Sequence, residues 1–277
     1  MDIKLVAIDL DRTTLNSEGH LSEANRNAIL SAIEKGVHVC IASGRAFDTL
    51  PKEVINIPGI EYAITSNGAA IYRIEDKECM RSFVLKPESV EKIMEMTKDY
   101  PVTYEAFIKG TAYCGKEYIN NPVKYGATPH SLNYVKSTRI IKEDIAAFIK
   151  QHKHELDSID IVINDTPIKE NIIKMLGESL DDIYITSSIK QLIEISYKDA
   201  GKKSGLLFIS ELLSIPVEFT AAFGDADNDI DMVKFAGFGV AMANASDNLK
   251  AVADYITLTN DEDGLSHAFK NVLKISD

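Results

Sequence analysis

The sequence predicts an α/β protein with a doubly wound, mostly parallel, Rossmann-like core sheet and an inserted α+β domain. Three observations carry this prediction. Apolar runs and amphipathic helices alternate near both ends of the chain, as in βαβ units. Several of these runs end in polar or acidic residues, at the edge where open parallel sheets bind their ligands. The alternation becomes irregular in the middle of the chain, which predicts a separate domain there.

The first βαβ unit is expected over residues 3–42. Its first strand is a short apolar run, and two acids one residue apart, Asp9 and Asp11, follow that strand directly. A helix then begins after Ser22, which is a good N-cap residue. The second strand covers residues 37–42, and the crossover between the two strands should be right-handed.

The second strand also ends in a polar tip, Ser43-Gly44-Arg45, and we expect a helix over residues 46–55 after it. A third strand follows over residues 62–65. Asn67-Gly68 comes next, between two apolar runs, and this pair is a strong turn signal.

The expected core domain comprises residues 1–83 and 191–277, and the expected inserted domain comprises residues 84–190. The insertion begins with a helix over residues 87–98 and continues with shorter, mixed segments. Its segments lack strand ends tipped with paired acids, so we expect the chemistry to lie in the core domain.

The first pattern returns after the insertion. A helix over residues 202–213 begins with Lys202, and a buried strand over residues 219–223 follows it. An acidic tip comes directly after this strand and contains Asp225, Asn228 and Asp229. Two further strands and a closing helix complete the predicted core.

The composition limits the possible partners. The chain has 277 residues, of which 45% are hydrophobic, and this is enough for a sizeable core. A net charge of −12 and a pI near 5.0 argue against binding nucleic acid or anionic membranes, although a locally positive site could bind a small anion. No stretch approaches the ~18 continuous apolar residues that a membrane span needs. We therefore expect a cytoplasmic protein without nucleic-acid or membrane partners, as a monomer or weak homodimer.

The polar strand ends suggest one shared site. Two acids as close as Asp9 and Asp11 need a divalent cation, a shared proton or environments that split their pKa values, unless they lie in a solvated loop. Carboxylate oxygens suit Mg²⁺, and a serine hydroxyl, a lysine and helix amides suit a phosphoryl group. An aspartate neutralised by a metal can attack phosphorus, and a second acid can protonate the leaving oxygen.

Four motifs in this order resemble those of the haloacid dehalogenase-like superfamily, and the resemblance covers essentially the whole chain. They are Asp9-Leu10-Asp11-Arg12-Thr13, Ser43-Gly44-Arg45, Lys202 and the segment Gly224-Asp225-Ala226-Asp227-Asn228-Asp229. The Ser66-Asn67-Gly68-Ala69 turn, the position of the insertion and the run at residues 240–245 resemble the Cof-type subfamily of type IIB. Proteins of that subfamily carry a large α/β cap between the second and third motifs.

The resemblance implies roles for four acids. Asp9 would be the nucleophile and a Mg²⁺ ligand. Asp11 would be the general acid and base, and its backbone carbonyl would bind the metal. Asp225 would also ligate Mg²⁺, with Asp229 supporting the metal site.

The resemblance also implies a set of binding residues. Ser43 and Lys202 would hold the phosphoryl group, together with Gly44 at the start of the following helix. Asn228 would orient the phosphate or the substrate. Asn67 would lie near the cap and join the substrate-binding residues.

The sequence departs from the family pattern at Arg12, where glycine or aspartate is common, so a positive φ there would be costly. If φ is negative there, Arg12 points to solvent or adds positive potential beside the phosphate. The third motif reads Lys202-Lys203, and its spacing to Gly205-Leu206 favours Lys202 as the lysine that faces the site.

The leading hypothesis is a Mg²⁺-dependent phosphatase of small phosphorylated metabolites, with sugar phosphates as the preferred class, that acts through an aspartyl-phosphate intermediate. The cap would exclude water and select the leaving group. Two alternatives stay open: a phosphosugar mutase of the same superfamily, and a non-catalytic phospho-acceptor or metabolite-binding protein.

Overall fold

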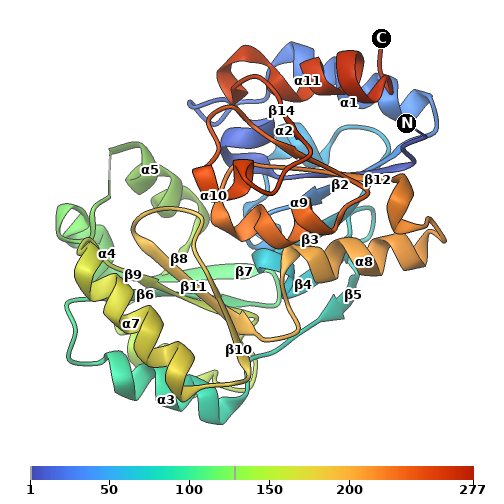
Figure 1. Ribbon diagram of the computed structural model, residues 1–277. Coiled ribbons are helices and arrows are strands. Elements are labelled where there is room, and N and C mark those ends of the chain that lie inside the picture. The colour runs from blue at the N-terminus through green and yellow to red at the C-terminus, as the bar shows by residue number, and fades with distance from the viewer. Residues whose placement is uncertain (1, 128) are drawn as a thin grey trace. The chain divides into compact units, whose positions relative to one another are not determined.

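The computed structural model describes residues 2–127 and 129–277 and contains two sheets, one in each of two units (Figure 1). The core unit comprises Met1–Gly44, Leu50–Arg81 and Gly201–Asp277. The inserted unit comprises Arg45–Thr49 and Ser82–Ala200. The predicted α/β core with an α+β insertion is confirmed.

The sheet of the core unit has eight strands in the order β14-β13-β12-β1-β2-β3-β4-β5. Its pairs from β14 to β3 are parallel, and β3 pairs with β4 in the antiparallel sense. The carboxyl ends of β12, β1 and β2 therefore meet at one edge. The strands are β1 (Leu5–Ile8), β2 (His38–Ala42), β3 (Ile60–Thr65), β4 (Ala70–Arg73), β5 (Cys79–Ser82), β12 (Thr220–Gly224), β13 (Phe238–Ala241) and β14 (Tyr255–Ile256).

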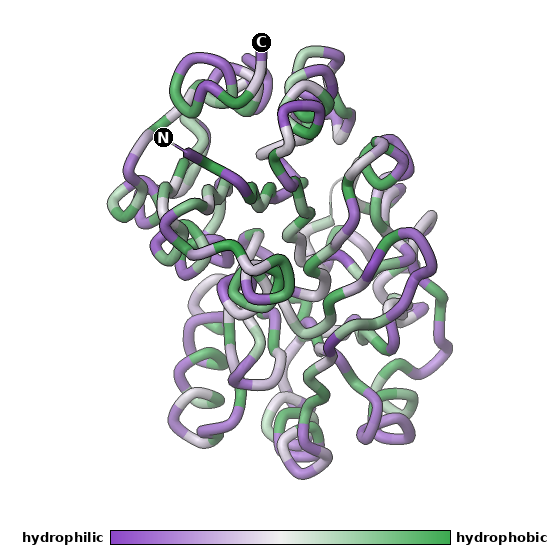
Figure 2. Tube along the Cα trace, turned by 90° about the vertical axis from the view of Figure 1, so that its right-hand side faces the viewer, coloured by the Kyte–Doolittle hydropathy of each residue, from purple (hydrophilic) through white to green (hydrophobic). Residues whose placement is uncertain are grey.

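Helices cover both faces of this sheet, as a doubly wound fold requires (Figure 1). Apolar residues of α8 and α9 form one core cluster with Leu5 and Ala7 of β1, while α1 packs with α11. Helices in Figure 2 alternate between hydrophilic and hydrophobic residues, the pattern of helices that bury one face. The helices are α1 (Glu23–Glu34), α2 (Lys52–Ile55), α8 (Lys202–Leu212), α9 (Ile230–Phe235), α10 (Asp247–Lys250) and α11 (Gly264–Ala268).

The helix expected over residues 46–55 is wrong. The chain forms a 3₁₀ turn over Phe47–Thr49 and a separate short helix, α2. Pro51 stands between them, and proline both lacks an N–H and disfavours helical geometry in the residue before it. The 3₁₀ turn also packs within the inserted unit, where the backbone N–H of Asp48 donates to the Gly110 carbonyl at 2.9 Å.

The inserted unit has a six-stranded sheet in the order β10-β11-β9-β6-β7-β8, and its pairs are antiparallel except β7 with β8. Residues of α3, α6 and α7 form an apolar cluster with one face of this sheet. The strands are β6 (Thr103–Ile108), β7 (Thr111–Gly115), β8 (Ile140–Lys142), β9 (Ser158–Val162), β10 (Ile183–Thr186) and β11 (Leu192–Tyr197). The helices are α3 (Pro87–Thr97), α4 (Lys116–Asn120), α5 (Pro129–Thr138), α6 (Ile145–Gln151) and α7 (Thr166–Ser179).

Among the described residues, none of the helices is both long enough and apolar enough to cross a membrane.

The inserted unit buries acids as well as apolar residues. Glu105, Asp160 and Glu194 are register partners on adjacent strands, so they lie in a row on one face of the sheet. Arg139 donates two hydrogen bonds to Glu105, at 3.0 and 2.8 Å. Burial, followed by the charges of Glu194 and Glu105, raises the pKa of Asp160 well above its usual value. Asp160 therefore costs stability at neutral pH, because its ionisation in a buried site is unfavourable.

Asp157 offers a measurable case of this cost. Burial raises the pKa of Asp157 from 3.8 to about 6, against weak hydrogen bonds from Gly110 N–H and the Ser82 hydroxyl. Between pH 4 and pH 6 the folded state therefore keeps a proton that the unfolded state has lost, so stability should fall as the pH rises. We expect the free energy of unfolding of wild type, relative to Asp157→Asn, to drop by up to about 3 kcal/mol from pH 4 to pH 7.

Urea denaturation at a series of pH values measures this difference. Asp99→Asn, at an exposed acid of the same unit, serves as the control and should leave the pH profile unchanged. A profile for Asp157→Asn that runs parallel to that of wild type would contradict the prediction.

Candidate active site

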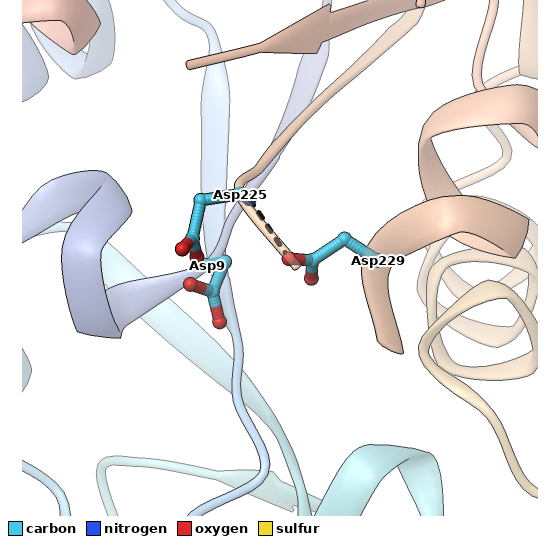
Figure 3. Close-up of side chains that lie close together, drawn as sticks. All are labelled: Asp9, Asp225 and Asp229. Carbon is cyan, nitrogen blue, oxygen red and sulfur yellow. Dashed lines mark hydrogen bonds between the residues drawn. The ribbon is translucent and has the colours of Figure 1, made fainter. Parts of the chain in front are cut away.

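Three buried acids meet at the carboxyl edge of the core sheet (Figure 3). Asp9 follows β1 and Asp225 follows β12, and these strands pair in parallel, with Ile8 opposite Phe223. Asp229 points back toward the other two from the turn that begins α9 (Figure 3). One carboxylate oxygen from each acid lies within 4.8 Å of those of the other two. The fold thus brings together acids that lie more than 200 residues apart in the sequence.

Asp229 already uses both of its carboxylate oxygens. Oδ2 accepts hydrogen bonds from the backbone N–H of Asp225 at 3.0 Å and of Ala226 at 3.1 Å. The absence of a side chain at Gly224 makes room for it, because a Cβ there would lie 2.4 Å from the Asp229 Cβ. Asp229 therefore holds the turn that carries Asp225 and supports the cluster.

Lys202 provides the positive charge at the centre of the cluster. It is 1% exposed, and its Nζ donates to Asp9 Oδ1 at 2.7 Å and to Asp229 Oδ1 at 2.6 Å. Lys203 is exposed, and its Nζ lies 5.4 Å from the centre of the Phe235 ring. Lys202 is thus the lysine that faces the acids.

In the part of the chain that the structure describes, the cluster holds three acids but only one lysine. Burial raises the pKa of Asp9 well above its usual value; the Lys202 charge opposes this shift, while Asp229 and Asp225 add to it. Burial and the charge of Asp229 raise the pKa of Asp225 to about 7. Burial alone would lower the pKa of Lys202, but the charges of Asp229 and Asp9 raise it overall. The charge of Lys202 does not offset the burial of Asp9 and Asp225, so the site favours a further cation.

The donor atoms fit a magnesium ion. Among the described residues, neither Asp9 Oδ2 nor Asp225 Oδ2 takes part in a hydrogen bond, while Thr13 donates to Asp225 Oδ1 at 3.2 Å. These two oxygens belong to neighbouring strand ends, and hard carboxylate oxygens are the ligands that Mg²⁺ prefers. The carboxylate of Asp11 is exposed and lies outside the cluster of three acids. Asp9 and Asp225 are therefore the side chains that could hold Mg²⁺ directly.

Ser43 and Gly44 lie at the same edge of the sheet, because they follow β2, which pairs with β1. The Ser43 N–H donates to the Ile64 carbonyl at 2.8 Å, and the side chain of Ser43 is buried. Asn67 and Asn228 are also buried, and the Asn228 Nδ2 donates to the Asn67 Oδ1 at 2.9 Å. Each residue that the sequence indicated thus belongs to this edge or to the turns beside it.

Arg12 has a left-handed backbone, with φ 59° and ψ 14°. This conformation costs a non-glycine residue about 1–2 kcal/mol, and two features of the structure accompany it. Asn244 donates a hydrogen bond from its Nδ2 to the Arg12 carbonyl at 2.9 Å. The Arg12 charge also helps to lower the pKa of Asp225, against the larger effect of burial. The costly positive φ is thus the case that the structure shows, and Arg12 also adds positive potential next to the acids, which the sequence analysis expected only for a negative φ.

The sequence reasoning assigned no role to Thr13 or Asn244. Thr13 stands in the first motif, and its hydroxyl orients Asp225. Asn244 holds the backbone of Arg12, and its Oδ1 accepts from the Asn260 N–H at 3.0 Å. Both lie in segments that resemble the family, Thr13 in the first motif and Asn244 in the run at residues 240–245, and this was the signal for them.

Comparisons with known proteins agree with this geometry. A family model described as haloacid dehalogenase-like hydrolase matches residues 6–269. The chain is 31% identical to phosphatase YwpJ of Bacillus subtilis, over 98% of this chain and 100% of YwpJ. It is also 31% identical to the 5-amino-6-(5-phospho-D-ribitylamino)uracil phosphatase YcsE of Bacillus subtilis, over 98% of this chain and 96% of YcsE. The solved structure of the subclass IIB sugar phosphatase BT4131 is 25% identical, covers 98% of this chain and 99% of its own, and superimposes with a TM-score of 0.84.

Proposed function

This chain belongs to the haloacid dehalogenase-like hydrolase family and is a phosphatase of subclass IIB, and from this premise we propose that it hydrolyses small phosphorylated metabolites with Mg²⁺. The proposal depends above all on one observation: Lys202 bridges Asp9 and Asp229 and Thr13 donates to Asp225, so one carboxylate oxygen of Asp9 and one of Asp225 remain for the metal and the substrate. That arrangement places a nucleophile, a cation site and a fixed positive charge at one edge of the sheet.

In the proposed reaction, the Asp9 carboxylate attacks the phosphorus in line, the bond from phosphorus to the leaving oxygen breaks, and an aspartyl-phosphate forms. Asp11 donates a proton to the leaving alcohol and later takes a proton from the water that hydrolyses the intermediate. Because the proton taken from water replaces the one given to the alcohol, Asp11 ends the cycle as it began it and serves both half-reactions.

The remaining residues of the site bind and orient the phosphoryl group, the substrate and Mg²⁺. Lys202 donates to Asp9 Oδ1 and so fixes the orientation of the Asp9 carboxylate. The Ser43 hydroxyl, the amide of Gly44 and Lys202 would hold the phosphoryl oxygens, and Asn228 would orient the substrate. Asp9, Asp225 and the backbone carbonyl of Asp11 would hold Mg²⁺, with Asp229 in support. When bound, Mg²⁺ neutralises charge on the phosphoryl oxygens and lets Asp9 stay ionised beside them.

The substrate class is part of the proposal. Sugar phosphates are the preferred class, since the structural relative BT4131 is described as a sugar phosphatase. Under this proposal, residues 84–190 act as a cap that excludes water and selects the leaving group.

The direct test is phosphate release from p-nitrophenyl phosphate and from a panel of sugar phosphates, with Mg²⁺ or with excess EDTA. We expect turnover with Mg²⁺ and a loss of about 10²-fold or more with EDTA, because a bound cation contributes several kcal/mol to such reactions. Readdition of Mg²⁺ should restore the rate. Equal rates with Mg²⁺ and with EDTA would contradict the proposal.

The same assay separates the alternatives. A phosphosugar mutase of this superfamily would convert a sugar phosphate to its isomer and release little phosphate, so both products are measured. A non-catalytic phospho-acceptor would give neither product. The phosphatases among the relatives favour hydrolysis over both alternatives.

A further inference from the structure

Three consecutive residues in the turn between β3 and β4 have a left-handed backbone. The φ angles are 48° at Ser66, 52° at Asn67 and 88° at Gly68, and all three residues are buried. Residues other than glycine avoid this region, because their Cβ approaches the following carbonyl oxygen. Such conformations persist only where the surroundings hold them in place, and they gather at functional sites.

Hydrogen bonds connect Asn67 to three separate segments of the core unit. Its backbone N–H donates to the Ser43 carbonyl at 3.1 Å, and its carbonyl accepts from the Gly201 N–H at 2.9 Å. Its Oδ1 accepts from the Asn228 Nδ2 at 2.9 Å. Gly201 directly precedes Lys202, so one buried residue links the end of β2, the start of α8 and the turn before α9.

We infer that Asn67 is a positioning residue that sets the distances among Ser43, Lys202 and Asn228 and does not itself bind the phosphoryl group. This inference rests on the proposed function, which gives those three residues to the substrate. The turn packs directly against the residue that precedes α8, because a Cβ on Gly68 would lie 2.1 Å from the Gly201 carbonyl oxygen. A shift of the turn would therefore displace Lys202 as well as Ser43.

Position 67 requires a left-handed backbone and a side chain that accepts the hydrogen bond from Asn228, and asparagine meets both requirements. It tolerates the left-handed region better than other residues with a side chain, and its side-chain oxygen accepts the hydrogen bond from Asn228. Glycine would meet only the first demand, and alanine neither. Asn67→Gly and Asn67→Ala both remove the side chain, but only Asn67→Gly preserves the backbone conformation.

The test measures the affinity for inorganic phosphate, the proposed product, by calorimetry in the presence of Mg²⁺, together with kcat and KM for p-nitrophenyl phosphate. We expect Asn67→Ala to weaken phosphate binding by about tenfold or more, the factor that corresponds to the left-handed penalty of alanine. Asn67→Gly should stay within about threefold of wild type. Its small effect should shrink in an Asn228→Ala background, because the hydrogen bond between these two side chains is then already absent.

Ser214→Ala is the matched control. Ser214 has the same left-handed backbone, with φ 55°, but follows α8 at the end remote from Lys202. It should lose no phosphate affinity, whatever its effect on melting temperature.

Equal losses in Asn67→Gly and Asn67→Ala would overturn the inference, since they would show direct contact between the side chain and the ligand. A lower melting temperature in Asn67→Ala with unchanged phosphate affinity would also overturn it. If Asn67→Ala does not fold, the comparison of Asn67→Gly with and without Asn228→Ala decides, and additive losses would count against the inference. A wild-type protein that neither binds nor releases phosphate would instead refute the proposed function, and the inference with it.

Discussion

Replacing Asp9 with asparagine is expected to abolish phosphate release while the fold stays intact. Asparagine has the same shape as aspartate, but its amide is not a nucleophile toward phosphorus, so no aspartyl-phosphate can form. We expect kcat to fall by at least about 10³-fold, which corresponds to about 4 kcal/mol of lost transition-state stabilisation. Phosphate release from p-nitrophenyl phosphate in the presence of Mg²⁺ measures this loss.

The Asp9→Asn variant should remain folded, so its loss of phosphate release would report the loss of the nucleophile and not unfolding. Asp9 is a buried acid whose pKa burial raises, so removing its charge should leave the melting temperature unchanged or higher. Lys202 keeps one carboxylate partner, because Asp229 still accepts its hydrogen bond. Asp231→Asn, at an exposed position of α9, is the matched control and should retain full activity. Mg²⁺-dependent turnover that persists in Asp9→Asn would rule out Asp9 as the nucleophile.

The carboxyl edge of the core sheet could be predicted from the sequence because the patterns that mark it are local. Apolar runs that stop at acids, as at Asp9 and Asp225, show both where a strand ends and where ligands bind in a parallel sheet. A doubly wound sheet brings such strand ends to one edge, but the pairing of β1 with β12, which sets Asp9 beside Asp225, comes from the structure.

Contacts between distant segments explain what the sequence did not reveal. Thr13 and Asp225 lie 212 positions apart, and Arg12 and Asn244 lie 232 positions apart, so no local pattern pairs them. The helix expected over residues 46–55 failed for this reason only in part: Arg45–Thr49 packs within the inserted unit, but Pro51 is a local helix breaker that the prediction did not take into account. The pair Asn67-Gly68 predicted a turn, but the hydrogen-bond partners of that turn lie in other segments.

Replacing Lys202 with methionine should have the second largest effect, on stability as well as on activity. The variant keeps the buried volume but leaves Asp9 and Asp229 without their cation. Breaking a buried ion pair by removing one partner typically costs about 3–5 kcal/mol, and loss of the phosphoryl-binding charge should lower kcat/KM by about 10³-fold. Lys203→Met, at the adjacent exposed lysine, should change stability by no more than about 0.5 kcal/mol.

The pH dependence of the free energy of unfolding of Lys202→Met shows whether the uncompensated acids cause the loss of stability. Without the lysine, the folded-state pKa of Asp9 rises further above its unfolded value, so the folded state holds a proton that the unfolded state releases as the pH rises. The loss of stability should therefore be greatest above pH 7 and should shrink toward pH 4, in urea denaturation without Mg²⁺. Adding Asp229→Asn to the variant removes one of the two uncompensated charges and should restore part of the stability but none of the activity. If the double variant is no more stable than Lys202→Met, the lysine stabilises the core by packing and not by neutralising the two acids.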